Sequence, residues 1–158
     1  MQDAAQGMIL RQDASAAPFA ARTGAGVVAF NDSLWPSRKN YENRRPAGLF
    51  NTGLDTNSNV LTAGSLDPHF ILTVAAQGPV PTNATVAVNH ANWLANDSES
   101  AWISMTNSGT ASIAAGNYNY RTTFSLDGFV LNTVELNMKL AVDNELTNVL
   151  LNGVSTGV

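Results

Sequence analysis

Residues 116–128 (GNYNYRTTFSLDG) and 142–157 (VDNELTNVLLNGVSTG) decide the fold class of this chain. In the first stretch, from Tyr118 onward, larger side chains occupy the even positions and small or polar ones the odd positions. This period of two predicts a half-buried strand. The second stretch carries Asn152 and Gly153 between apolar residues, which is the strongest short signal for a β-hairpin. Together the two stretches predict antiparallel β structure.

The rest of the chain continues this pattern in short runs separated by turns rich in Gly and Asn. Strands are expected at residues 69–74, 85–88, 101–104, 118–126 and 134–142, followed by a final hairpin at 149–151 and 154. Strands at such regular spacing are typical of an antiparallel sandwich. We therefore expect an all-β fold: an antiparallel, jelly-roll-like β-sandwich over residues 49–158, preceded by an extended, mostly irregular N-terminal arm over residues 1–48.

The expected arm has little regular pattern. It is rich in Ala between residues 4 and 21, where Pro18 would interrupt any helix, and residues 31–46 mix aromatics, cations and prolines without a period. Such a segment is typical of a docking arm that orders on a partner, with a flexible leader as the alternative. Its aromatic and cationic residues are typical interface anchors, or else form a solvated basic loop. The candidate docking residues are Trp35, Arg38, Lys39, Tyr41, Arg44 and Arg45.

Composition and charge exclude several kinds of protein. The chain has 158 residues, a net charge of -4 and no cysteine, and only 13% of its residues are charged. The missing cysteines exclude disulfides, zinc–thiolate sites and a thiol nucleophile. The negative charge argues against nucleic-acid binding. No apolar run is long enough to span a membrane, and the residues after Met1 predict no signal peptide. Low charge with many Asn, Thr and Ser residues is typical of extracellular or virion β proteins.

Several short motifs resemble one protein family. Residues 50–55 (FNTGLD), 67–70 (DPHF) and 93–96 (WLAN), with the two stretches quoted above, resemble the galactose-binding-like jelly-roll modules of secreted bacterial proteins, including those with a PEP-type C-terminal sorting signal. The resemblance implies a sandwich over about residues 49–158. This chain departs from the family in that the family continues for several strands after the hairpin. The departure implies an exposed sheet edge that a partner would cover, and hence an oligomer.

One loop offers candidate ligand-binding residues. His90, Asn92, Trp93, Asn96 and Asp97 lie between two predicted strands. An exposed aromatic ring with nearby amides and carboxylates can hold a sugar, and loops at the end of a sandwich often carry recognition. The alternative is that the aromatic residues belong to the core, as we expect for Trp102.

Metal binding and catalysis have less support. Calcium could be held by oxygen ligands from Asp55, Asn57, Asn59 and Asp67, with an Asx-rich turn as the alternative. The chain has two histidines and no Gly-x-Ser-x-Gly motif, and its close acid pairs lie in predicted turns, so we assign no catalytic residue.

These observations predict a non-enzymatic structural or attachment protein. Its arm would dock the sandwich into a larger particle, such as a phage virion, as a fibre, tail or head-decoration protein, with glycans as further candidate partners beside other protein subunits. The alternative is a secreted or cell-surface bacterial carbohydrate-binding module that lacks its leader and last strands here.

Overall fold

The computed structural model describes residues 7–16, 45–108 and 113–157. These residues form antiparallel β-strands and one short 3-10 helix, η3 (Leu131–Thr133), and the described part of the chain holds no α-helix. The all-β prediction is therefore confirmed.

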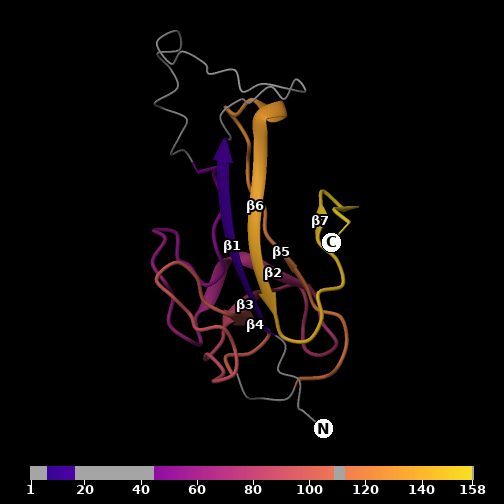
Figure 1. Ribbon diagram of the computed structural model, residues 1–158. Coiled ribbons are helices and arrows are strands. Elements are labelled where there is room, and N and C mark those ends of the chain that lie inside the picture. The colour runs from indigo at the N-terminus through magenta and orange to yellow at the C-terminus, as the bar shows by residue number, and fades with distance from the viewer. Residues whose placement is uncertain (1–6, 17–44, 109–112, 158) are drawn as a thin grey trace.

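Six strands form one antiparallel sheet with the order β5-β2-β3-β4-β1-β6 (Figure 1). The strands are β1 (Gly7–Ala16), β2 (Leu66–Val74), β3 (Thr82–Val86), β4 (Ile103–Ser104), β5 (Asn119–Arg121) and β6 (Val134–Val142). A second, two-stranded sheet is the hairpin of β7 (Leu150–Leu151) and β8 (Val154–Ser155). Since the described strands form one large sheet and a separate hairpin, the two-layered jelly-roll sandwich stays a prediction.

Strand β1 comes from the segment that the sequence analysis assigned to the irregular arm. It pairs with β6 along its whole described length after Gly7, from Met8 opposite Val142 to Ala16 opposite Val134. Its first two residues also pair with β4. The expectation of an irregular arm is thus wrong for residues 7–16. The cause is a non-local pairing, because the partner strand lies more than a hundred residues away and leaves no local pattern in β1.

Apolar side chains pack in two clusters. The larger consists of Phe70, Ala84, Val86, Ala101 and Ile103, with Leu61, Tyr120 and Leu140 packed against it. The smaller joins Ala87 and Trp102, with Trp93 and Ala141 against them. Leu140 and Ala141, consecutive residues of β6, pack against different clusters because neighbouring side chains of a strand point to opposite faces. Trp102 is 2% exposed, which confirms its predicted place in the core.

The C-terminal elements follow the sequence closely. Strand β6 has the predicted bounds, and the hairpin turns at Asn152 (φ 52°) and Gly153 (φ 81°), as a type I′ turn requires. Strand β5 is shorter than predicted, although burial still alternates from residue 118 to 124. Beyond it the chain makes an isolated bridge between Ser125 and Ala47.

Candidate functional site

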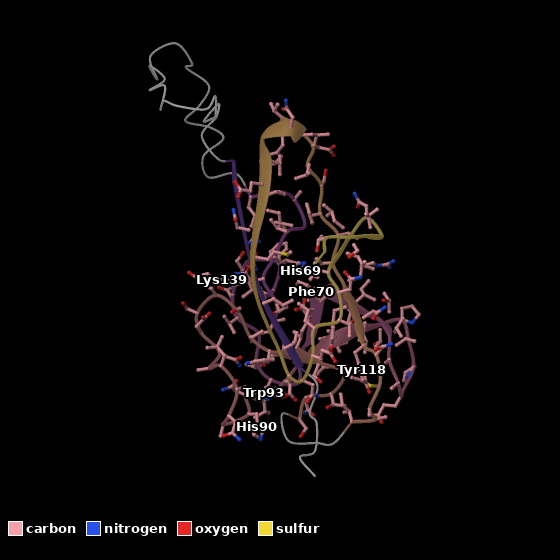
Figure 2. The ribbon with its side chains drawn as sticks, turned by 45° about the vertical axis from the view of Figure 1, so that its right-hand side comes forward. His69, Phe70, His90, Trp93, Tyr118 and Lys139 are labelled. Carbon is pink, nitrogen blue, oxygen red and sulfur yellow. The ribbon has the colours of Figure 1, made fainter. Side chains whose placement is uncertain are left out.

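The predicted ligand loop between β3 and β4 is built around three aromatic rings in tilted contact. The ring centroids of His90 and Trp93 are 5.7 Å apart, and those of Trp93 and Trp102 are 4.5 Å apart. Trp102 Nε1 donates a hydrogen bond of 2.7 Å to the Leu94 carbonyl. Figure 2 shows His90 and Trp93 together at the lower end of the molecule. The buried Trp102 thus anchors the loop, and Trp93 lies half-buried on it.

Most polar side chains of this loop hold the loop itself. His90 Nδ1 accepts a hydrogen bond of 3.2 Å from the Asn92 amide, and Asn96 Oδ1 accepts one of 3.0 Å from the Trp102 amide. Asp97 Oδ1 accepts from the amides of Glu99 and Ser100 at 2.8 and 3.0 Å. The loop is therefore pre-organised, and of the five predicted ligand residues Asn92 and Asp97 are the exposed ones.

A hollow of about 230 Å³ lies beside this loop. It is lined by Leu94, Ala95, Asp97, Ser100, Lys139, Leu140 and Ala141. Of the five predicted ligand residues, Asp97 alone lines it. The sequence analysis missed Lys139 because this residue comes from β6, far away in the chain. Asp97 and Lys139 are the charged residues among those that line it.

The candidate calcium residues lie in turns that their own side chains stabilise. Asp55 Oδ1 accepts from the amides of Asn57 and Asn59, both at 2.8 Å, and Oδ2 accepts from Asn59 Nδ2 at 3.1 Å. These hydrogen bonds lower the pKa of Asp55. Asp67 is fully buried and accepts from three backbone amides, those of Gly53, His69 and Phe70.

These contacts are those of the alternative, an Asx-rich turn, because the carboxylate oxygens are occupied by N–H donors. Within residues 45–108 and 113–157, no group of three or more His, Asp or Glu side chains is placed to hold a metal ion. The calcium site stays a prediction.

A second hollow, of about 340 Å³, lies on the outer face of β2 and β5. Gly48, Pro68, His69, Ile71, Arg121 and Thr123 line it. His69 stacks on Phe50 with ring centroids 3.5 Å apart, and its Nε2 donates to the Asp55 carbonyl at 3.3 Å. This hollow was not predicted from the sequence, because it joins two strands that are distant in the chain.

One predicted docking residue, Arg45, contacts the domain predicted over residues 49–158. The guanidinium carbon of Arg45 lies 3.9 Å from the centroid of the Phe50 ring, and its Nη2 donates to Ser58 Oγ at 3.1 Å. Arg45 therefore packs on the sheet domain itself. The other candidate docking residues lie outside the described residues; these are Trp35, Arg38, Lys39, Tyr41 and Arg44.

No family model, curated protein or solved structure matches this chain. In the part of the chain that the structure describes, no helix has the length and apolar character needed to cross a membrane.

Proposed function

We propose that this chain is a non-enzymatic structural or attachment protein that works as a subunit of a larger assembly. The observation that carries the proposal is the exposed apolar hairpin of β7 and β8. Leu150, Leu151 and Val154 are 56%, 50% and 70% exposed. The hairpin pairs with none of the other described strands, and Figure 1 draws it to one side of the long β1–β6 ribbon.

An isolated two-stranded hairpin is at best marginally stable in water, and exposed apolar strands favour addition of another chain. A protein subunit that covers the hairpin would both stabilise it and remove its apolar surface from water. A phage fibre, tail or head-decoration protein suits a chain with low charge, no cysteine and such a surface.

The oligomeric state of the full chain tests this proposal. Sedimentation velocity should show species larger than the 16.7 kDa monomer. The double variant Leu150→Gln/Val154→Thr should shift the chain toward monomer. The matched control is Leu66→Gln/Val88→Thr, which changes two residues that are 61% and 52% exposed elsewhere. A chain that is monomeric at all concentrations, or equal behaviour of the two double variants, would overturn the proposal.

The ligand loop supports a second candidate function, a glycan-binding module of a secreted or cell-surface protein. The observation in its favour is the half-buried Trp93, in tilted ring contact with His90 and Trp102 on a loop that lines a hollow. A glycan array should then show binding that Asn92→Ala weakens and that Asn117→Ala, an exposed control elsewhere, leaves unchanged. An array without binding would remove this candidate.

A further inference from the structure

Strand β6 forms one edge of the six-stranded sheet. It pairs with β1 on one side, and from Glu135 to Val142 the described residues supply no backbone hydrogen bond to its other side. A nine-residue strand extends about 30 Å. Figure 1 shows β6 running side by side with β1. An edge of this length offers a row of backbone donors and acceptors to another strand.

The charged residues of β6 are placed symmetrically about Asn137. Apolar residues occupy the even positions, including Leu136 and Met138, while Glu135 and Lys139 occupy odd positions on the other face. Both charged residues are exposed. Glu135 and Lys139 lie at equal distances on either side of Asn137, with opposite charges.

We propose that β6 pairs antiparallel with β6 of a second copy of this chain, in the register that sets Asn137 opposite the partner's Asn137. This register places Glu135 opposite the partner's Lys139, and the two-fold symmetry repeats the pair. It also places Leu136 opposite the partner's Met138. Directly opposite residues of antiparallel strands interact most strongly, with opposite charges favoured. The contact is closed and self-complementary, as in most symmetric dimers.

The neighbouring registers lack this complementarity. A centre at Leu136 sets Glu135 opposite the partner's Asn137, and a centre at Met138 sets it opposite the partner's Ala141. Neither pairs the two charges, so the centre at Asn137 is favoured over both.

The inference rests on the proposed assembly function, but it uses a different surface from the β7–β8 hairpin.

A single cysteine can report the register, because the native chain contains none. Facing Cα atoms of antiparallel strands lie about 4.5–5.5 Å apart, within the range of a disulfide. Mild oxidation of Asn137→Cys should therefore give a covalent dimer. Glu135→Cys should not, because its two copies would lie about 14 Å apart along the strands. Circular dichroism checks that each variant folds.

Charge reversal gives an independent measurement. Glu135→Lys sets Lys opposite Lys in both symmetric pairs and should raise the dimer dissociation constant about tenfold. Equimolar mixing with Lys139→Glu should restore association, as should the double variant Glu135→Lys/Lys139→Glu. Glu145→Lys, which makes the same charge change at an exposed position beyond β6, should leave the constant unchanged.

The outcomes separate this inference from the proposed function. An oligomer that the hairpin variant dissociates, while Asn137→Cys gives no cross-link and Glu135→Lys has no effect, rejects the β6 pairing and keeps the assembly function. A wild-type chain that is monomeric at all concentrations overturns both. A cross-link at residue 137 with rescue by charge exchange supports the register.

Discussion

Replacement of Asp67 tests what holds the loop before β2 to the sheet. Asp67 is 0% exposed, and its carboxylate accepts hydrogen bonds from the amides of Gly53, His69 and Phe70 at 2.7, 2.8 and 3.2 Å. The first bond spans fourteen residues and fixes the loop, while the other two fix the start of β2. Loss of this carboxylate should therefore loosen both segments together.

The expected loss in the free energy of unfolding follows from the amide donors that Asp67→Ala would leave without an acceptor. A buried polar group without a partner costs about 1–3 kcal/mol. Asp67→Ala leaves the amides of Gly53 and Phe70 without an acceptor in buried positions. The variant also no longer has a carboxylate to bury, and the desolvation penalty it avoids offsets part of that cost. We expect a loss of about 2–4 kcal/mol in the free energy of unfolding. Asp67→Asn can retain both bonds at Oδ1 and loses the one to Gly53, so it should cost about 1–3 kcal/mol.

The pH dependence has a definite sign. Burial raises the pKa of Asp67 above its ordinary value of 3.8, although the three amide hydrogen bonds act in the opposite direction. The folded state therefore binds the proton more tightly than the unfolded state. The wild-type free energy of unfolding, measured relative to Asp67→Asn, should fall as pH rises from about 3.8 through the raised pKa, and then stay level.

Urea denaturation between about pH 3.5 and 8, an interval that includes the ordinary carboxyl pKa, measures both effects. Comparison with Asp67→Asn cancels the contribution of other carboxylates, such as Asp55. Asp127→Ala, at an exposed position, is the surface control. If Asp67→Ala stays within about 0.5 kcal/mol of wild type, as a surface substitution would, the carboxylate does not hold these segments. A difference that rises with pH would refute the argument from burial.

Three further substitutions test packing by urea denaturation or thermal melting. Gly53→Ala should cost about 1–3 kcal/mol more than Gly153→Ala: both glycines have positive φ, but at Gly53 a Cβ would come 2.6 Å from a neighbouring side-chain carbon, whereas Gly153 has nothing within 4 Å. Equal losses would contradict this packing. Arg45→Ala should cost about 0.5–1 kcal/mol through lost contact with the aromatic ring below it. An unchanged melting temperature would mean that the contact between Arg45 and the Phe50 ring contributes nothing to the stability of the fold. Trp102→Phe should cost about 1–3 kcal/mol because the Leu94 carbonyl loses its 2.7 Å donor, and a neutral result would show that this bond does not anchor the loop.

Local patterns predicted those elements that depend on neighbouring residues. The bounds of β6 follow from alternation and β-branched residues, and the β7–β8 hairpin follows from the backbone angles that Asn152 and Gly153 accept. The burial of Tyr120 against the core follows from the period of two around it.

Other features depend on contacts between distant parts of the chain. The partner of β1 lies at the opposite end of the chain, so residues 7–16 carry no local sign of their place in the sheet. Lys139 reaches the hollow beside Asp97 only because the fold brings β6 to that loop. The burial of Asp67 was also hidden, because a short acid before Pro68 fits an exposed turn equally well.

The β1–β6 ribbon connects the fold to the proposed assembly. Within the described residues, β1 meets β4 only at Gly7 and Met8, so residues 9–16 are paired with β6 alone. Figure 1 shows this ribbon extending beyond the other strands. Two strands without further support are marginally stable in water, whereas pairing of β6 across a two-fold axis would make four strands. The ribbon should then gain stability from association, and its melting should depend on protein concentration. That dependence is expected for wild type and should weaken in Glu135→Lys but not in Glu145→Lys. A melting temperature that is independent of concentration in all three would show that the ribbon is stable without a partner.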